Sequence, residues 1–334
     1  MRGNRFTESL NPNEKNISIL LILMLALWYD LFLPQNTYMG RLFQPESSPL
    51  YMESPLYTLL LGWLQPWGII NDIAALLLFI ATGGLLIRFN GTFAYIKVRT
   101  ILPAVFFCTL GSIFFCHTLT PGIFLSVLLI GGLYSSFFYV ETFNPIHAFN
   151  AGLFISIATL LSPTYILLII PYFIFFHSTS ALNLRSFLAS LFGFIIPALY
   201  ATLYYVVIGE TATLTEFFSK SFSTLSIQYK FNDLETAYLL FLGCTTAWAI
   251  GHFILDNTHD NIKSRKQNTH INSLFLWILA LMIIGFPDSQ NLLYPLTLLW
   301  SMILGRFFSI NSSRIAYIVF FLFLAISLLT FILA

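Results

Sequence analysis

Long apolar stretches alternate with short polar ones along most of this chain. A helix needs about 20 apolar residues to cross a bilayer, with a range of roughly 17–25. The pattern therefore predicts an all-α polytopic transmembrane helix bundle with about eleven spans, within a range of ten to twelve. The predicted spans are 17–33, 67–87, 101–117, 121–140, 150–162, 164–177, 186–207, 235–256, 272–285, 289–305 and 315–333.

Two of these spans, 150–162 and 164–177, are short and are separated only by Ser162-Pro163. They are interpreted either as two short spans or as one re-entrant pair. The polar segment 257–271 is predicted to be a solvated connector of mixed charge. No internal repeat and no pair of similarly interrupted helices is recognised, so the whole chain, 1–334, is treated as one integral membrane domain.

Composition narrows the function classes. The chain is 57% hydrophobic and only 9% charged, whereas soluble domains contain about 25% charged residues. A net charge of +1 provides no basic face for nucleic acid, so no nucleic-acid partner is expected. Three cysteines are too few for a disulfide scaffold. The expected surroundings are the lipid bilayer.

The distribution of Lys and Arg predicts the orientation. These residues collect on the cytoplasmic side of membrane proteins. With the N-terminus inside and eleven spans, only Arg41, Lys220 and Lys230 of the fifteen Lys and Arg fall outside, and the other twelve fall inside. The sequence therefore predicts that the N-terminus faces in and the C-terminus faces out.

Two predicted outer segments are long. The first, 33–66, is rich in proline, and Ser54-Pro55 is expected to start a short interfacial helix over 54–64. The second, 208–234, is expected to hold an amphipathic helix, either on the membrane surface or as a plain surface helix. Its apolar face is formed by Leu214, Phe217, Phe218, Phe222 and Leu225.

Two sequence features mark the start of this second helix. Thr213 and Glu216 match a capping box, in which the two ends of the T-x-x-E pattern satisfy backbone N–H groups. Glu216 and Lys220 stand four residues apart and are expected to pair on the wet face.

Acidic residues near the predicted outer boundary form the best candidate site. Asp30 ends the first span, Glu46 and Glu53 follow in the first outer segment, and Asp72 begins the second span. Carboxylates at this position can bind a divalent cation or act as a general base, or they can be solvated loop residues. The predicted spans from the third to the seventh lack charged residues in their centres, which weighs against an ion-coupled transporter.

Short sequence motifs in the middle of the chain resemble a bacterial family of polytopic inner-membrane proteins of unknown function. The resemblance extends over most of the chain and implies a multi-pass protein of the bacterial inner (plasma) membrane. It is carried by Ser54-Pro-Leu-Tyr-Thr-Leu-Leu-Leu-Gly-Trp-Leu64, Arg99-Thr-Ile-Leu-Pro-Ala104, Asn144-Pro-Ile-His-Ala-Phe-Asn-Ala-Gly-Leu153 and Ser162-Pro163.

The layout also resembles GT-C-type glycosyltransferases, which use polyprenyl-phosphate sugars. The resemblance implies an active site on the periplasmic face. Asp30 would be the catalytic acid or metal ligand, with Glu46 and Glu53 as further catalytic carboxylates and Arg41 on the lipid phosphate. That family often has an adjacent acidic pair, whereas Asp30 is flanked by Tyr29 and Leu31.

Two functions follow as expectations. The first is a GT-C-like protein of cell-envelope biogenesis that handles a polyprenyl-phosphate-linked sugar, with a divalent cation as the candidate cofactor. The alternative is a non-catalytic membrane subunit or scaffold of an envelope assembly or transport complex, whose outer segments contact other envelope proteins.

Overall fold

The structure is a computed structural model that describes residues 12–28, 54, 56–58, 68–114, 119–179, 183–223, 233–255, 261–311 and 313–333. Across these residues the regular elements are all helices. In chain order they are α2 (Glu14–Leu27), α4 (Gly68–Phe93), α5 (Leu102–Phe114), α6 (Pro121–Thr142), α7 (Pro145–Leu161), η3 (Pro163–Leu168), α8 (Ile169–Ser178), α9 (Leu184–Ile208), α10 (Thr211–Ser223), α11 (Asp233–Leu255), α12 (Ile262–Ile284), η5 (Ser289–Leu292), α13 (Leu293–Ile310) and α14 (Arg314–Leu333).

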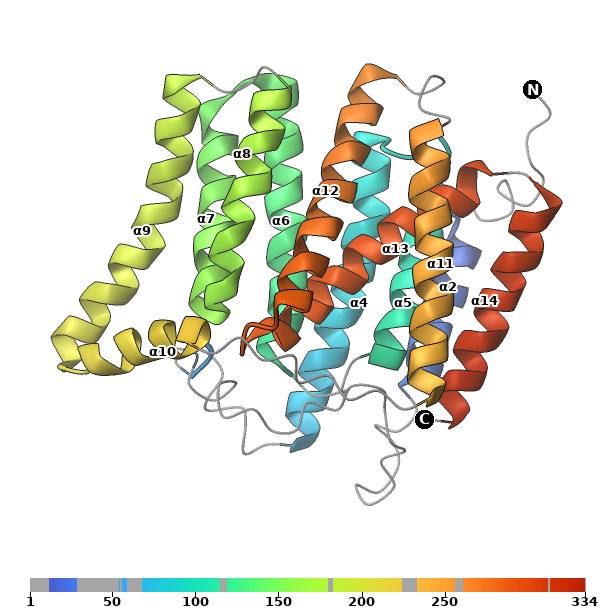
Figure 1. Cartoon of the computed structure of the whole chain (residues 1–334), viewed down its shortest axis with the longest axis horizontal. Helices are drawn as coiled ribbons and strands as arrows, with labels where there is room; N and C mark the ends of the chain where they lie inside the picture. The colour runs from blue at the N-terminus through green and yellow to red at the C-terminus, as the bar shows by residue number, and fades with distance from the viewer. Residues whose placement is uncertain are drawn as a thin grey trace.

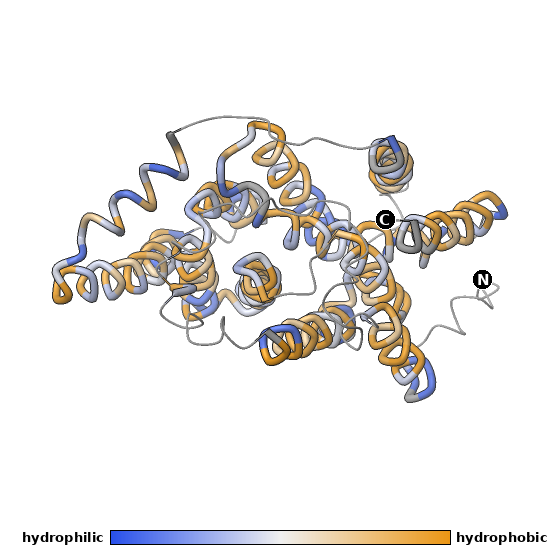
Figure 2. The backbone as a smooth tube through the Cα atoms, turned by 90° about the horizontal axis from the view of Figure 1, so that it is seen from below, coloured by the Kyte–Doolittle hydropathy of each residue, from blue (hydrophilic) through white to orange (hydrophobic). Residues whose placement is uncertain are grey.

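Successive long helices run up and down between two ends of the bundle (Figure 1). We call the end where α4 finishes and α5 begins the upper end, and the end where α6 begins and α7 finishes the lower end. The helix α14 finishes at the lower end, and α13 crosses the bundle obliquely. The exception is α10, which lies across the lower end rather than along the bundle (Figures 1 and 2).

Six helices are long and apolar enough to cross a membrane: α4, α6, α9, α11, α12 and α13. Five shorter apolar helices complete the set, at Lys15–Leu27, Leu102–Phe114, Pro145–Leu161, Pro163–Ser178 and Arg314–Ser327. Each of the eleven predicted stretches overlaps one of these helices, with different bounds. Apolar residues dominate the lengths of the helices (Figure 2). By length and composition, the chain is an integral membrane protein.

Glycine allows the closest helix packing in the bundle. A Cβ on Gly152 of α7 would collide with the backbone of Ser190 in α9, and one on Gly193 of α9 would collide with the backbone of Phe149 in α7. Small residues let membrane helices approach until their backbones touch. The helix α9, which is otherwise largely exposed, is held against α7 by this seam.

The start of α12 differs from the sequence expectation. The segment 257–271 was predicted to be a solvated connector, but α12 begins at Ile262 and most of that segment is helical. Ser264 and Asn268 donate hydrogen bonds of 3.0 and 2.9 Å to the carbonyl of Tyr95, in the connection between α4 and α5. Polar residues on one face of α12 are therefore buried against protein rather than solvated.

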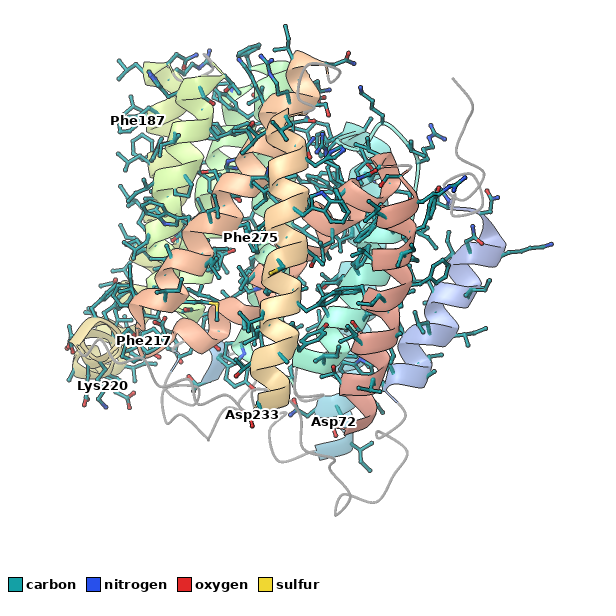
Figure 3. All side chains as sticks on the ribbon, turned by 45° about the vertical axis from the view of Figure 1, so that its right-hand side comes forward. Asp72, Phe187, Phe217, Lys220, Asp233 and Phe275 are labelled. Atoms are coloured by element: carbon teal, nitrogen blue, oxygen red, sulfur yellow. The ribbon has the colours of Figure 1, made fainter. Side chains whose placement is uncertain are left out.

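The helix α10 also begins earlier than predicted. It starts at Thr211, so Thr213 lies inside the helix and is not its cap. Glu216 and Lys220 form the expected ion pair, at 3.0 Å, on the exposed face. Phe217 of the same helix is buried. Figure 3 shows Phe217 and Lys220 at the lower end of the molecule.

Candidate functional site

The residues proposed from sequence lie outside the described part of the chain. Asp30, Arg41, Glu46 and Glu53 belong to the segment between α2 and α4, of which only 54 and 56–58 are described. Their arrangement, and the roles assigned to them, stay predictions. The helices that flank this segment place its two ends at the lower end of the bundle (Figure 1).

The described part of this segment is docked into the bundle. The hydroxyl of Ser54 donates a 3.1 Å hydrogen bond to the carbonyl of Leu160 at the end of α7. The hydroxyl of Tyr57 donates a 2.9 Å bond to the carbonyl of Leu119, just before α6. Both side chains are buried. Residues 56–58 are helical within the predicted interfacial helix 54–64, and Tyr57 anchors them to protein.

A buried carboxylate lies next to this docking point. Asp288, between α12 and η5, is 4% exposed and is the one buried Asp or Glu among the described residues. Its Oδ2 accepts hydrogen bonds from the Ser162 hydroxyl at 2.6 Å and from the Thr164 backbone N–H at 3.1 Å. Its Oδ1 accepts a hydrogen bond from the Thr164 hydroxyl. Asp288 therefore joins two helical hairpins at the lower end.

Burial raises the pKa of the Asp288 carboxyl, and the hydrogen bonds from Ser162 and Thr164 act in the opposite direction. Burial disfavours the charged form, whereas donors to the carboxylate favour it. Burial has the larger effect here. The carboxylate is thus held in place by neutral donors within the described part of the chain.

Proline creates the two turns that meet at Asp288. The helix α7 ends at Leu161, and Pro163 opens the 3-10 helix η3, which leads into α8. The helix α12 ends at Ile284, and Pro287 precedes the 3-10 helix η5, which leads into α13. Proline cannot continue a helix but suits a first helical turn. Each of the two turns therefore joins successive helices through a short 3-10 helix that is opened or preceded by proline.

Several oxygen atoms in the same region are buried without a hydrogen-bond partner. They belong to the side chains of Asn291 in η5, Ser126 in α6 and Thr120 just before α6. Asn291 is 5% exposed and Ser126 is 1% exposed. Buried polar atoms normally have a partner in the protein or in ordered water.

The helix α10 covers part of this region. It packs against η3, and the Phe222 ring meets the Phe286 ring edge-on at 5.7 Å between centroids. Phe286 stands two residues before Asp288. The docked residues 54 and 56–58 and the amphipathic helix therefore both contact elements that carry the Asp288 region.

A separate apolar cavity of about 330 Å³ opens between α2, α5 and α14. It reaches the last residue of α2, the next-to-last of α5 and the second half of α14, which all lie toward the lower end (Figure 1). Its wall consists of Leu23, Leu27, Thr109, Ile113, Leu324, Ala325 and Ser327. The hydroxyls of Thr109 and Ser327 are bonded within the protein, so the cavity presents a hydrocarbon surface.

Metal ligands are not gathered in the described part of the chain. Those residues contain no group of three or more His, Cys, Asp or Glu able to hold a metal ion. The divalent cation expected from sequence rests on Asp30, Glu46 and Glu53, which lie outside the described residues. Asp72, which was grouped with them from sequence, lies at the lower end (Figure 3).

The sequence places Asp288 near a membrane boundary, just before an apolar stretch. It does not identify the residues that donate hydrogen bonds to Asp288. Ser162-Pro163-Thr164 precedes it by more than a hundred positions, and hydropathy contains no information about that pairing. The usable signal was the occurrence of two prolines, Pro163 and Pro287, each close to a hydroxyl residue at a break between apolar stretches.

Comparison of the chain with protein-family models, with curated proteins and with solved structures found no match.

Proposed function

We propose that the chain crosses the inner membrane of a bacterium eleven times, with its upper end in the cytoplasm and its lower end in the periplasm. The eleven described Lys and Arg residues support this orientation. Lys220, in α10, is the only one that belongs to the lower end; the others belong to α2, α9, α12, α13, α14 and the region where α4 leads into α5. Such a bias places the basic end inside. The short helices α7 and α8 then count as two spans.

We further propose that the protein handles a polyprenyl-phosphate-linked sugar at its periplasmic face, as part of cell-envelope biogenesis. The observation that carries this proposal is the apolar cavity between α2, α5 and α14. Leu27, at the lower end of α2, lines this cavity, and Asp30 follows it by three residues in sequence. A prenyl chain in the cavity would bring its phosphate and sugar to the segment that carries the candidate acids.

The chemistry assigned to these residues is glycosyl transfer. Asp30 would accept the proton of the acceptor hydroxyl as the hydroxyl oxygen bonds to the anomeric carbon, and the polyprenyl phosphate would leave with the electrons of the broken C–O bond. Arg41 would pair with the lipid phosphate, for which its planar donors are suited. Glu46 and Glu53 would orient the acceptor or hold a divalent cation.

The test is transfer of labelled sugar from a polyprenyl-phosphate donor by the purified full-length protein. Asp30→Asn should abolish transfer while expression and folding stay intact. Glu216→Gln is the matched control, because Glu216 is an exposed acid at the lower end whose described ion-pair partner is Lys220. Unchanged transfer by Asp30→Asn would remove Asp30 as the key acid.

A second candidate function is a non-catalytic membrane subunit of an envelope assembly. The hydrogen bonds of Asp288 favour this candidate. This buried acid accepts bonds from Ser162 and Thr164 and so joins two hairpins, which is a structural role. The absence of transfer by the wild-type protein, together with co-purification of a defined envelope protein that contacts α10, would favour this candidate over the enzyme.

A further inference from the structure

Among the described residues, no opposite charge balances a charge on Asp288. Its described donors are the side chains of Ser162 and Thr164 and the backbone N–H groups of Thr164 and of Asp288 itself, all of them neutral. The one described Lys or Arg of the lower end, Lys220, is exposed and paired with Glu216. An ionised carboxylate in a dry site is strongly unfavourable unless a cation or a proton neutralises it.

Orphaned oxygen atoms lie on the elements that surround this carboxylate. The backbone N–H of Asn291 donates a 3.1 Å hydrogen bond to the carbonyl of Asp288. This bond is the 3-10 type, in which side chains three positions apart lie on the same face. The amide oxygen of Asn291 is buried and has no donor, so it shares a face with the carboxylate.

The first turns of α6 close the site from the other side. The 3-10 helix η5 packs against α6, and the Tyr294 ring covers Gly122 so closely that a Cβ there would collide with it. The hydroxyl of Tyr165, next to Thr164, lies 3.5 Å from the carbonyl of Leu125. These contacts bring η3, η5 and the first turns of α6 together, and the orphaned hydroxyls of Thr120 and Ser126 belong to this part of the chain.

We propose that Na⁺ binds at the lower end of the bundle among the Asp288 carboxylate, the Asn291 amide oxygen and the hydroxyls of Thr120 and Ser126. All of these donors are oxygen atoms, which are the ligands of hard cations. A single carboxylate matches a single positive charge. Oδ1 receives one side-chain bond whereas Oδ2 receives two bonds, so Oδ1 keeps lone-pair capacity for the ion.

The arrangement also suits an ion of small radius. The last carbonyls of a helix have no partner within that helix, and carbonyl oxygens are ligands of hard cations. Both α7 and α12 end beside Asp288, and the close fit of Tyr294 on Gly122 limits the space. This site is independent of glycosyl transfer, since none of its residues has been assigned a role in that chemistry.

The test is thermal unfolding of the full chain in nanodiscs made of neutral lipid. The salt is NaCl, KCl or choline chloride at one constant ionic strength, which separates binding from general screening. We expect the unfolding midpoint to rise by several degrees in NaCl, to saturate with concentration, and to stay unchanged when K⁺ or choline replaces Na⁺. A ligand that binds only the folded state has this effect. An equal midpoint in the three salts would overturn the site.

Two variants with a matched control connect the effect to the proposed ligands. Ser126→Ala and Asn291→Ala should each lose the Na⁺ shift. Ser136→Ala should keep it, because Ser136 is buried on the same helix but its hydroxyl is bonded to the carbonyl of Leu133. Retention of the full shift by both ligand variants would overturn the assignment.

A direct binding measurement distinguishes loss of the ion site from loss of folding. Binding of ²²Na⁺ to the purified protein should saturate, and Asn291→Ala should reduce it at least tenfold in affinity. Glu216→Gln should bind normally. If lowering the pH stabilises the wild-type protein but Na⁺ neither binds nor stabilises it, the carboxylate is neutralised by a proton and the cation site is wrong.

Discussion

The hydroxyl of Ser162 lies 2.6 Å from Oδ2 of Asp288, although the two residues are 126 positions apart in the chain. This hydrogen bond joins the turn between α7 and α8 to the turn between α12 and α13. Thr164 reinforces it from the first turn of η3. The lower ends of two hairpins are thereby held in one arrangement, on the face where we place the function.

Removing the Thr164 hydroxyl should destabilise this junction. Thr164→Val keeps the side-chain shape but removes a donor to a buried carboxylate, and hydrogen bonds to charged groups contribute about 1.5–3 kcal/mol. We expect a loss of that size in the free energy of unfolding, measured by denaturant titration in mixed micelles. Thr159→Val is the control, because the Thr159 hydroxyl bonds to Ile155 within its own helix. Equal losses in the two variants would contradict the proposed importance of the junction.

The stability of the protein should depend on pH through Asp288. Its folded-state pKa is raised above the ordinary value of 3.8, so the folded state keeps a proton that the unfolded chain releases. The stability from this proton is complete below the ordinary value and is lost as the pH rises through the raised value. In buffer without Na⁺, we expect the free energy of unfolding to fall across this window. Asp288→Asn should show no such fall, and a fall that persists in it would point to another group.

The sequence predicted the helices far better than the contacts between them. All eleven predicted apolar stretches overlap helices, because the requirement for apolar length is local. The start of α12 was missed because Ser264 and Asn268 read as solvated residues, although a carbonyl in the connection between α4 and α5 receives their bonds. The partners of Asp288 were missed for the same reason, because a polar pair far apart in sequence has no periodicity.

Replacing glycine by alanine should change the stability of the protein in opposite directions in the seam between α7 and α9 and on α4. Gly152→Ala should destabilise the protein by about 1–3 kcal/mol, because the added methyl group meets the backbone of Ser190. Gly84→Ala on α4 has open space around it and should stabilise its helix by up to about 1 kcal/mol. Unfolding in mixed micelles measures both changes. Tolerance of the methyl group at Gly152 would show that α9 is not held by this seam.

The proposed orientation predicts which end a membrane-impermeant thiol reagent can reach. The three native cysteines are first replaced, and single cysteines are introduced at exposed positions at the two ends. Lys220→Cys on α10 should react in intact cells, whereas Arg185→Cys at the start of α9 should react only after the membrane is permeabilised. The reverse result would invert the orientation and place the acidic face in the cytoplasm.

The most direct measurement of the proposed function is the pool of polyprenyl-phosphate-linked sugars in a strain that lacks this protein. We expect a sugar donor of this class to accumulate in that strain, because the step that consumes it is missing. Expression of the wild-type chain should return the pool to normal, whereas Asp30→Asn at equal expression should not. An unchanged pool in the deletion strain, or full restoration by Asp30→Asn, would contradict sugar transfer through Asp30 at the periplasmic face.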